Sequence, residues 1–315
     1  MPAADAKPWL SFPEQAELLR ARGMPDVDEH LDDLAQLGYY GLSGYWYPFR
    51  QIGPNGVSRG DHFFEGTTFR DVLALYNFDT RLRESVWACL SALEIQLRVS
   101  VGHELGRLDP FAHVNPDVLD QRVVARKFDQ FRRSLESLQV RSKEDVVQHF
   151  LQRYDGLMPV WVATEIMQMG QLVTLFELAP FAVRRDIAER YGARADEFHS
   201  WLKSLNIIRN VVAHHGRLWN RSIGMKPQLS HRRSDPLLDH ARGTVDRIYG
   251  VLAVMAYLLR ARGTHDRLME LRSVLLDFPQ MRTVSPAMMK MPVSWEQHVL
   301  WSPGWKLGEA TSPRG

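Results

Sequence analysis

The chain has 315 residues, of which 45% are hydrophobic and 24% charged, a composition typical of soluble globular proteins with enough apolar material for a core. Its 39 Lys and Arg against 37 Asp and Glu give a formal net charge of +2, which excludes binding of nucleic acid through a global basic field. The single cysteine, Cys89, excludes a disulfide framework.

The first residues predict a small helical module rather than a leader. Residues 1–8 lack a basic stretch followed by an apolar one, so we expect no secretory signal and a cytoplasmic protein. Ser11 is placed to cap a helix that begins at Pro13. Asp26 is placed to cap a helix that reaches Leu37, where Gly38 ends it.

The segment Tyr39–Phe49 contains six aromatic residues in eleven. Two interpretations stay open: a plug of buried rings that joins the first module to the main bundle, or a platform on which unpaired bases stack. Residues 51–66 are rich in glycine and end in paired aromatics, which indicates a loop or a short hairpin.

A long core helix is predicted from Thr67 or Thr68 to about Gly106, because its apolar residues recur three, four or seven positions apart. Glu94 and Arg98 lie four residues apart on it and form an ordinary ion pair. Residues 115–155 are basic and less regular, and predict two outer helices. Their basic run is read as a solvated face, with phosphate contact as the alternative.

Three further helices follow in the second half of the chain. They are expected at Val160–Ala179, at about Ala193–Ala213 with Gly216 as its stop, and from Asp235 to about Arg262. The apolar part of the last helix, Ile248–Leu259, is too short to cross a membrane. From Phe278 onward, prolines and tryptophans predict an extended tail that wraps over the bundle to about residue 306.

The densest polar motif lies at residues 209–221, where arginines, amides and histidines interrupt an apolar helix. Arg209 and His214 are separated by four residues and lie about 140° apart on an ideal helix. The two side chains can reach the same substrate atom only if the helix ends there, if the long arginine side chain curls round the helix, or if a second copy of the motif faces the first. Asn210 and His214 share one side of the helix, so Asn210 is placed to orient the imidazole.

A guanidinium and an imidazole suffice for metal-free cleavage of RNA. The 2′-hydroxyl attacks the adjacent phosphorus, the histidine moves a proton, and the arginine stabilises the charge on the phosphate. The motif by itself is equally compatible with a structural polar network. A metal site that joins His214 and His215 to His199 or His231 is a third interpretation. Glu165 has no basic partner on its own helix, so we expect it to meet Arg209.

An ordered set of segments resembles the Abi-like family of abortive-infection proteins, whose core is a HEPN domain. The resemblance covers most of the chain. The matching segments are Gly38–Trp46, Thr68–Arg83, Glu94 with Arg98, Met158–Trp161 ahead of Glu165, and Ser204–Arg221.

This resemblance implies an all-α HEPN-type bundle with an N-terminal helical module (residues 1–66), a bundle (67–265) with a helical insertion at about 115–155, and a C-terminal extension (266–315). It implies a metal-independent endoribonuclease without a cofactor, a homodimer in which two copies of the motif meet, and an RNA or protein antitoxin. The implied catalytic residues are Arg209, His214 and Asn210, with Glu165, His215, Asn206 and Arg217 supporting them and Arg98 and Arg221 contacting RNA. The alternative is a non-catalytic RNA-binding or regulatory module.

Overall fold

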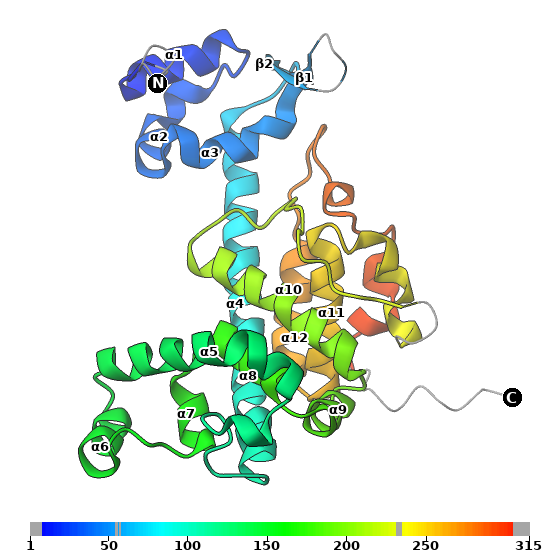
Figure 1. Cartoon of the computed structure of the whole chain (residues 1–315). Helices are drawn as coiled ribbons and strands as arrows, with labels where there is room; N and C mark the ends of the chain where they lie inside the picture. Colours follow the sequence, from blue (N-terminus) through cyan, green and yellow to red (C-terminus); the bar gives the residue numbers. More distant parts are fainter. Residues whose placement is uncertain (1–7, 54–55, 57, 231–234, 305–315) are drawn as a thin grey trace, which may run out of the picture. The chain divides into compact units, whose positions relative to one another are not determined.

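The computed structural model describes residues 8–53, 56, 58–230 and 235–304, and helices dominate them (Figure 1). The expected all-α class is confirmed, because the strands in this part of the chain form a single two-stranded hairpin. Contacts divide the chain into unit 1, which is Met1–Leu82 with Val274–Met288, and unit 2, which is Arg83–Ser273 with Met289–Gly315. The division into residues 1–66, 67–265 and 266–315 stays a prediction of the sequence.

The α-helices are α1 (Phe12–Ala21), α2 (Leu31–Leu37), α3 (Tyr39–Trp46), α4 (Phe69–Gly106), α5 (Gln121–Arg141), α6 (Asp145–Tyr154), α7 (Val160–Ile166), α8 (Met169–Leu178), α9 (Phe181–Glu189), α10 (Ala195–Ala213), α11 (Ile248–Ala261) and α12 (His265–Leu276). The 3-10 helices are η2 (Val27–His30), η3 (Tyr47–Phe49), η4 (Pro116–Val118), η5 (Pro236–Thr244), η6 (Pro286–Met289), η7 (Trp295–Gln297) and η8 (Val299–Trp301). Within the described part of the chain, no helix combines the length and apolar character that crossing a bilayer requires.

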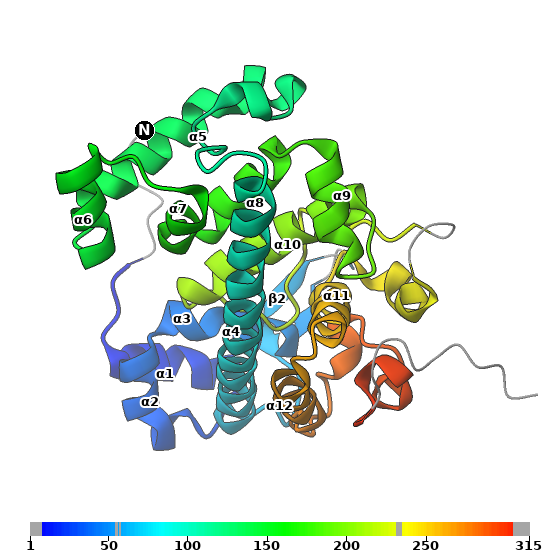
Figure 2. The same ribbon diagram turned by 90° about the horizontal axis from the view of Figure 1, so that it is seen from below.

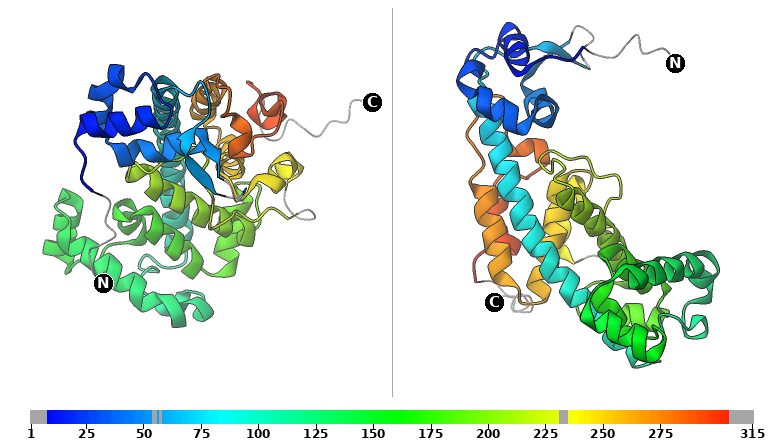
Figure 3. Two further views of the ribbon diagram at one scale, coloured as in Figure 1. Left: turned by 90° about the horizontal axis from the view of Figure 1, so that it is seen from above. Right: turned by 90° about the vertical axis from the view of Figure 1, so that its left-hand side faces the viewer.

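Unit 1 gathers α1–α3 and a hairpin of β1 (Arg50–Ile52) and β2 (Arg59–Phe63) at the start of α4 (Figure 3). Ser11 is the N-cap residue of α1 as predicted, but its side chain makes no cap hydrogen bond to the helix backbone. Glu14 instead accepts hydrogen bonds from the backbone N–H and the hydroxyl of Ser11 at 2.7 and 2.6 Å. Gly38, with φ of 75°, ends α2 as expected. The hairpin confirms the turn-rich reading of residues 51–66.

The Asp26 carboxylate caps a helix that lies far from it in the sequence. Asp26 precedes η2, but its carboxylate makes no cap bond there. Its two oxygens instead accept the backbone N–H groups of Phe69 (2.7 Å) and Arg70 (3.2 Å), at the start of α4. The prediction that Asp26 caps the helix reaching Leu37 is therefore wrong. The unpaired N–H groups of the 38-residue α4 attract the carboxylate from a distant part of the chain.

Unit 2 is built around α10 and α11. Helix α11 is buried from Ile248 to Arg260 and contacts α10, η5 and η8, while α8 contacts α5 and α10. Helices α4 and α12 lie side by side in the views of Figures 1 and 2, and the Cys89 thiol meets the Arg267 carbonyl between them at 3.5 Å. The buried reduced thiol and the buried helix at Ile248–Leu259 are thus confirmed.

Two predicted helices are each broken in the structure. The helix expected at Val160–Ala179 leaves the helical conformation at Met167 (ψ 140°), because Gln168 starts α8 with a capping box to Gln171. The helix expected from Asp235 to Arg262 is η5 followed by α11. Val245, which follows η5, lies so close to the first turn of α11 that a Cβ on Gly250 would be 2.6 Å from the Cα of Val245.

The outer helices and the tail complete the comparison with the sequence. Two helices, α5 and α6, fill residues 115–155 as predicted, whereas α9 and α12 were not anticipated. The tail is not extended throughout, because η6–η8 interrupt it and bury Leu300 and Trp301. Buried Arg260 holds it by donating to the carbonyl oxygens of Leu300, at 3.1 Å, and Ser302. Residues 305–315 of the expected tail lie outside the described residues.

Candidate functional site

The polar motif begins at the end of α10. The helix ends at Ala213, and His214 follows as the C-cap with φ of −98°. His215 adopts the left-handed conformation (φ 54°), while the N–H of Gly216 donates to the Val211 carbonyl at 2.8 Å. Gly216 was expected to be the stop, but His215 is the residue that turns the chain. Both histidines are therefore exposed at a helix end and lie outside the regular helix.

Arg209 lies one turn earlier and faces α4. Its Nε is 3.7 Å from Oε2 of Glu94, and its guanidinium carbon is 5.4 Å from the centre of the Trp87 ring. The side chain remains 26% exposed. The ion pair on one side and the aromatic face on another limit the freedom of the arginine side chain, which lowers the entropy lost when it binds an anion.

Glu94 is the centre of this arrangement. Its other oxygen, Oε1, accepts a hydrogen bond from Nη2 of Arg98 at 2.5 Å, which confirms the predicted pair on α4. The same Nη2 donates to the carbonyl of Met167 at 3.0 Å. That carbonyl is available because the chain leaves the helical conformation between α7 and α8. One carboxylate thus joins α4 to α10, and one arginine joins α4 to the break after α7.

Glu165 does not take the role expected of it. It is exposed on α7, and the carboxylate that faces Arg209 belongs to Glu94 instead. Glu165 contributes to a cavity of about 470 Å³ whose wall also includes Arg98, Trp161 and Gly102. Glu94 is recognisable in the sequence as an acidic residue among apolar ones, but Arg98, four residues later, is a sufficient partner within the same helix, so the sequence does not predict its second partner on α10.

The other predicted residues are placed as follows. Asn210 is exposed; its carbonyl accepts the helical bond from the His214 N–H at 3.1 Å, and no hydrogen bond of its side chain to the imidazole exists among the described residues. The Asn206 amide packs against Gly170 of α8. After α10, the Arg217 guanidinium lies 6.0 Å from the Trp219 ring centre, and Arg221 donates to the Arg217 carbonyl at 3.1 Å.

The metal interpretation receives no support from the described residues, where no three His, Cys, Asp or Glu side chains are grouped to hold an ion. His199 lies 3.3 Å from Glu177, which Lys127 also contacts at 2.6 Å. Burial, with nearby Lys203, lowers the pKa of His199 to about 4. His231, the other histidine of that interpretation, lies outside the described residues.

Comparison with known proteins identifies one relationship. The family model described as "Abi-like protein" matches residues 32–220, which is more than half of the chain. The match runs from α2 to the polar turn after α10, so it contains Glu94, Arg98, Arg209 and His214. No curated protein and no solved structure matches the chain.

Proposed function

This chain belongs to the Abi-like protein family, and from that premise we propose that it is a metal-independent HEPN-type endoribonuclease that acts on cellular or phage RNA. Membership in the family suggests a role in abortive infection, the defence in which an infected cell stops growing before phage multiply. The ribonuclease reading adds a chemical mechanism to that role. It rests on the arrangement of charged groups at the end of α10.

The observation that carries the proposal is that two arginines share one carboxylate, and that the helix of one of them, Arg209, ends at an exposed histidine. Glu94 faces both Arg98 and Arg209, so the cluster keeps a net positive charge. A partly exposed guanidinium with spare positive charge suits the non-bridging oxygens of a phosphodiester. His214, exposed at the helix end, supplies an imidazole, a side chain that can accept or donate a proton.

In the proposed reaction the 2′-oxygen of RNA attacks the neighbouring phosphorus and the bond to the 5′-oxygen breaks. The products are a 2′,3′-cyclic phosphate and a 5′-hydroxyl. His214 makes one of the two proton transfers, taking the proton from the 2′-hydroxyl or giving one to the leaving 5′-oxygen, and water makes the other. Arg209 stabilises the charge on the phosphate in the transition state. Asn210 would orient the imidazole once substrate or a partner subunit is present. DNA lacks the 2′-hydroxyl and is not a substrate.

We propose further that the active form is a homodimer. Large apolar side chains are exposed on the helices that carry the site, namely Trp87, Ile95 and Val99 of α4 and Ile207 of α10. Exposed apolar side chains close to a charged site are typical of a surface that a partner covers. A second copy would also bring a second Arg209 and His214 to the site. An RNA or protein antitoxin remains part of the proposal through the family resemblance.

The ribonuclease proposal is tested with purified protein, total RNA and excess chelator. We expect the wild type and a His62→Ala control, which alters an exposed histidine of β2, to cut RNA and leave cyclic phosphate ends. Arg209→Ala and His214→Ala should each cut at least about 100-fold more slowly. Equal cutting by His214→Ala and wild type would refute the role of His214, and loss of cutting with chelator would refute a metal-free reaction.

The dimer is tested by sedimentation and by mixing inactive variants. Arg209→Ala and His214→Ala, refolded together, should regain part of the activity if each site takes its arginine and its histidine from different subunits. A monomer that cuts RNA at full rate would refute the composite site. Wild-type protein that binds RNA tightly without cutting it would favour the non-catalytic alternative.

A further inference from the structure

The aromatic segment after Gly38 serves two purposes in the structure. Tyr45, Trp46 and Phe49 are buried, as the plug interpretation predicts. Tyr45 is also anchored, because its hydroxyl donates to the buried carboxylate of Asp79 at 2.6 Å. The two tyrosines at the start of α3 behave differently, since both line a cavity on the surface of unit 1. The interpretation as a buried plug therefore does not explain the positions of Tyr39 and Tyr40.

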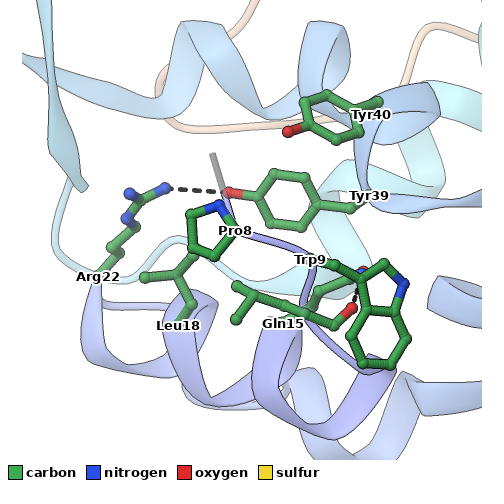
Figure 4. A pocket seen from close by; sticks show the side chains of 8 residues that line it. Pro8, Trp9, Gln15, Leu18, Arg22, Tyr39 and Tyr40 are labelled. Atoms are coloured by element: carbon green, nitrogen blue, oxygen red, sulfur yellow. Dashed lines mark hydrogen bonds between the residues drawn. The ribbon is translucent and has the colours of Figure 1, made fainter. Parts of the chain in front are cut away.

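This aromatic cavity has a volume of about 570 Å³, within the range of sites that hold small molecules. Figure 4 shows α1 forming one wall, with Gln15 and Leu18, and the first turn of α3 forming the opposite wall. The chain that leads into α1 closes one side. The residues that line it are Pro8, Trp9, Leu10, Gln15, Leu18, Arg22, Tyr39 and Tyr40.

The Tyr39 ring is fixed before any ligand arrives. Its hydroxyl accepts a hydrogen bond from Nη1 of Arg22 at 3.0 Å, visible in Figure 4, and its ring meets Trp46 edge-on with centroids 4.8 Å apart. Tyr40 contacts the same ring edge-on at 5.6 Å. The Tyr39 hydroxyl has no acceptor among the described residues, so its proton remains available for a ligand. A ring held in this way loses little entropy on binding.

Gln15 supplies a hydrogen-bond acceptor of defined direction. Its Nε2 donates to the Leu10 carbonyl at 2.8 Å, and this bond decides which end of the amide is the oxygen. The oxygen, Oε1, is buried and has no donor in the described part of the chain. A buried acceptor without a partner costs free energy of folding, which a ligand with an N–H group would recover. An aliphatic ligand would leave this oxygen unsatisfied.

Two large aromatic side chains stand at the cavity without being buried. Trp9 is 85% exposed and Tyr40 73% exposed, so neither contributes much to the core. Exposed rings around a cavity with one acceptor, one hydroxyl donor and the guanidinium of Arg22 suit a flat ring whose edge carries both donors and acceptors. Nucleobases have this combination. An aromatic cavity without the polar edge would suit many apolar ligands equally well.

We propose that the aromatic cavity binds one unpaired nucleobase, presented either by single-stranded RNA or by a free nucleotide. The base stacks on Tyr40 or Trp9, an N–H of its edge donates to Oε1 of Gln15, and the Tyr39 hydroxyl donates to a ring nitrogen or carbonyl. The RNA source rests on the proposed ribonuclease function, whereas the free-nucleotide source does not. In the first case the cavity selects which RNA is held, through residues other than those of the Arg209 motif.

The test measures binding rather than cleavage, so that it does not depend on the ribonuclease. Full-length protein is titrated with the four nucleoside 5′-monophosphates by calorimetry, and with a short 2′-O-methyl single strand, which cannot be cut through its 2′-oxygen, by fluorescence anisotropy. Trp9→Ala and Tyr40→Ala should each raise Kd by about 5- to 100-fold, the usual effect of removing one stacking ring. Tyr47→Ala, an equally drastic change at a 48% exposed tyrosine outside the cavity, is the matched control.

Smaller changes test the polar edge. Tyr39→Phe keeps the ring and removes one hydroxyl, and should raise Kd by about 2- to 10-fold, as expected for the loss of one hydrogen bond. Strand binding that Trp9→Ala and Tyr40→Ala weaken would assign the cavity to RNA, whereas nucleotide binding that they weaken, with strand binding unchanged, would assign it to a free nucleotide. Failure of wild-type protein to bind either probe at millimolar concentration, or an equal loss in Tyr40→Ala and Tyr47→Ala, would overturn the proposal.

Discussion

Replacing Glu94 with glutamine removes the one negative charge that separates two guanidinium groups. Glu94 is 12% exposed, and its partners Arg98 and Arg209 are 22% and 26% exposed. An exposed ion pair contributes about 0–1 kcal/mol, and breaking a buried one costs about 3–5 kcal/mol. The side chains here are partly buried, and the glutamine oxygen still accepts one hydrogen bond. We therefore expect Glu94→Gln to lower the free energy of unfolding by about 2 kcal/mol.

Urea denaturation followed by circular dichroism measures this change, and salt identifies its cause. In the variant, Arg98 and Arg209 repel each other without a carboxylate between them. Added salt screens that repulsion, so the deficit relative to wild type should shrink as ionic strength rises. A loss of packing would not respond to salt in this way.

Glu165→Gln is the matched control, because it neutralises an exposed carboxylate with no ion pair among the described residues. It should change the free energy of unfolding by less than about 0.5 kcal/mol. A Glu94→Gln variant as stable as wild type would refute the reasoning. A Glu165→Gln variant that loses as much stability as Glu94→Gln would also refute it, because the stabilisation would then not be specific to the carboxylate that pairs with the two arginines.

Three further predictions concern buried groups. Burial lowers the pKa of His113 to about 4, so the unfolded chain binds its proton more readily, and up to about 3 kcal/mol of stability should be lost as the pH falls from about 6.5 to about 4. His113→Gln should flatten that slope in urea titrations, and an unchanged slope would count against it. Gly102→Ala should lower the melting temperature, since its Cβ would lie 2.8 Å from the Thr164 hydroxyl, whereas Gly41→Ala, with open space around it, should not. Burial raises the pKa of Cys89 to about 12, so iodoacetamide should label it only after unfolding, as mass spectrometry would show; rapid labelling of folded protein would contradict this.

Much of the fold follows from local patterns in the sequence. The start and end of α4, the hairpin and the position of α10 were all predictable, because apolar periodicity and glycine placement act over a few residues. The breaks inside two predicted helices were not. At Gln168 a capping box competes with continued helix, and between η5 and α11 the backbone at Val245 comes so close to Gly250 that a Cβ there would not fit. At each break the free-energy difference between continuing and ending the helix is small, so tertiary packing decides which occurs.

The candidate site also has some features that the local sequence predicts and others that depend on the fold. The residue types at the end of α10 and their spacing can be read directly from the chain, with Arg209 and His214 separated by four residues. That Glu94 rather than Glu165 faces Arg209, and that Asp26 caps α4, depends on how distant segments fold together. Helix periodicity reports which side of a helix is apolar, but it does not report which distant side chain arrives there. Charged and capping groups pair across long stretches of chain, and their partners are therefore fixed by the fold.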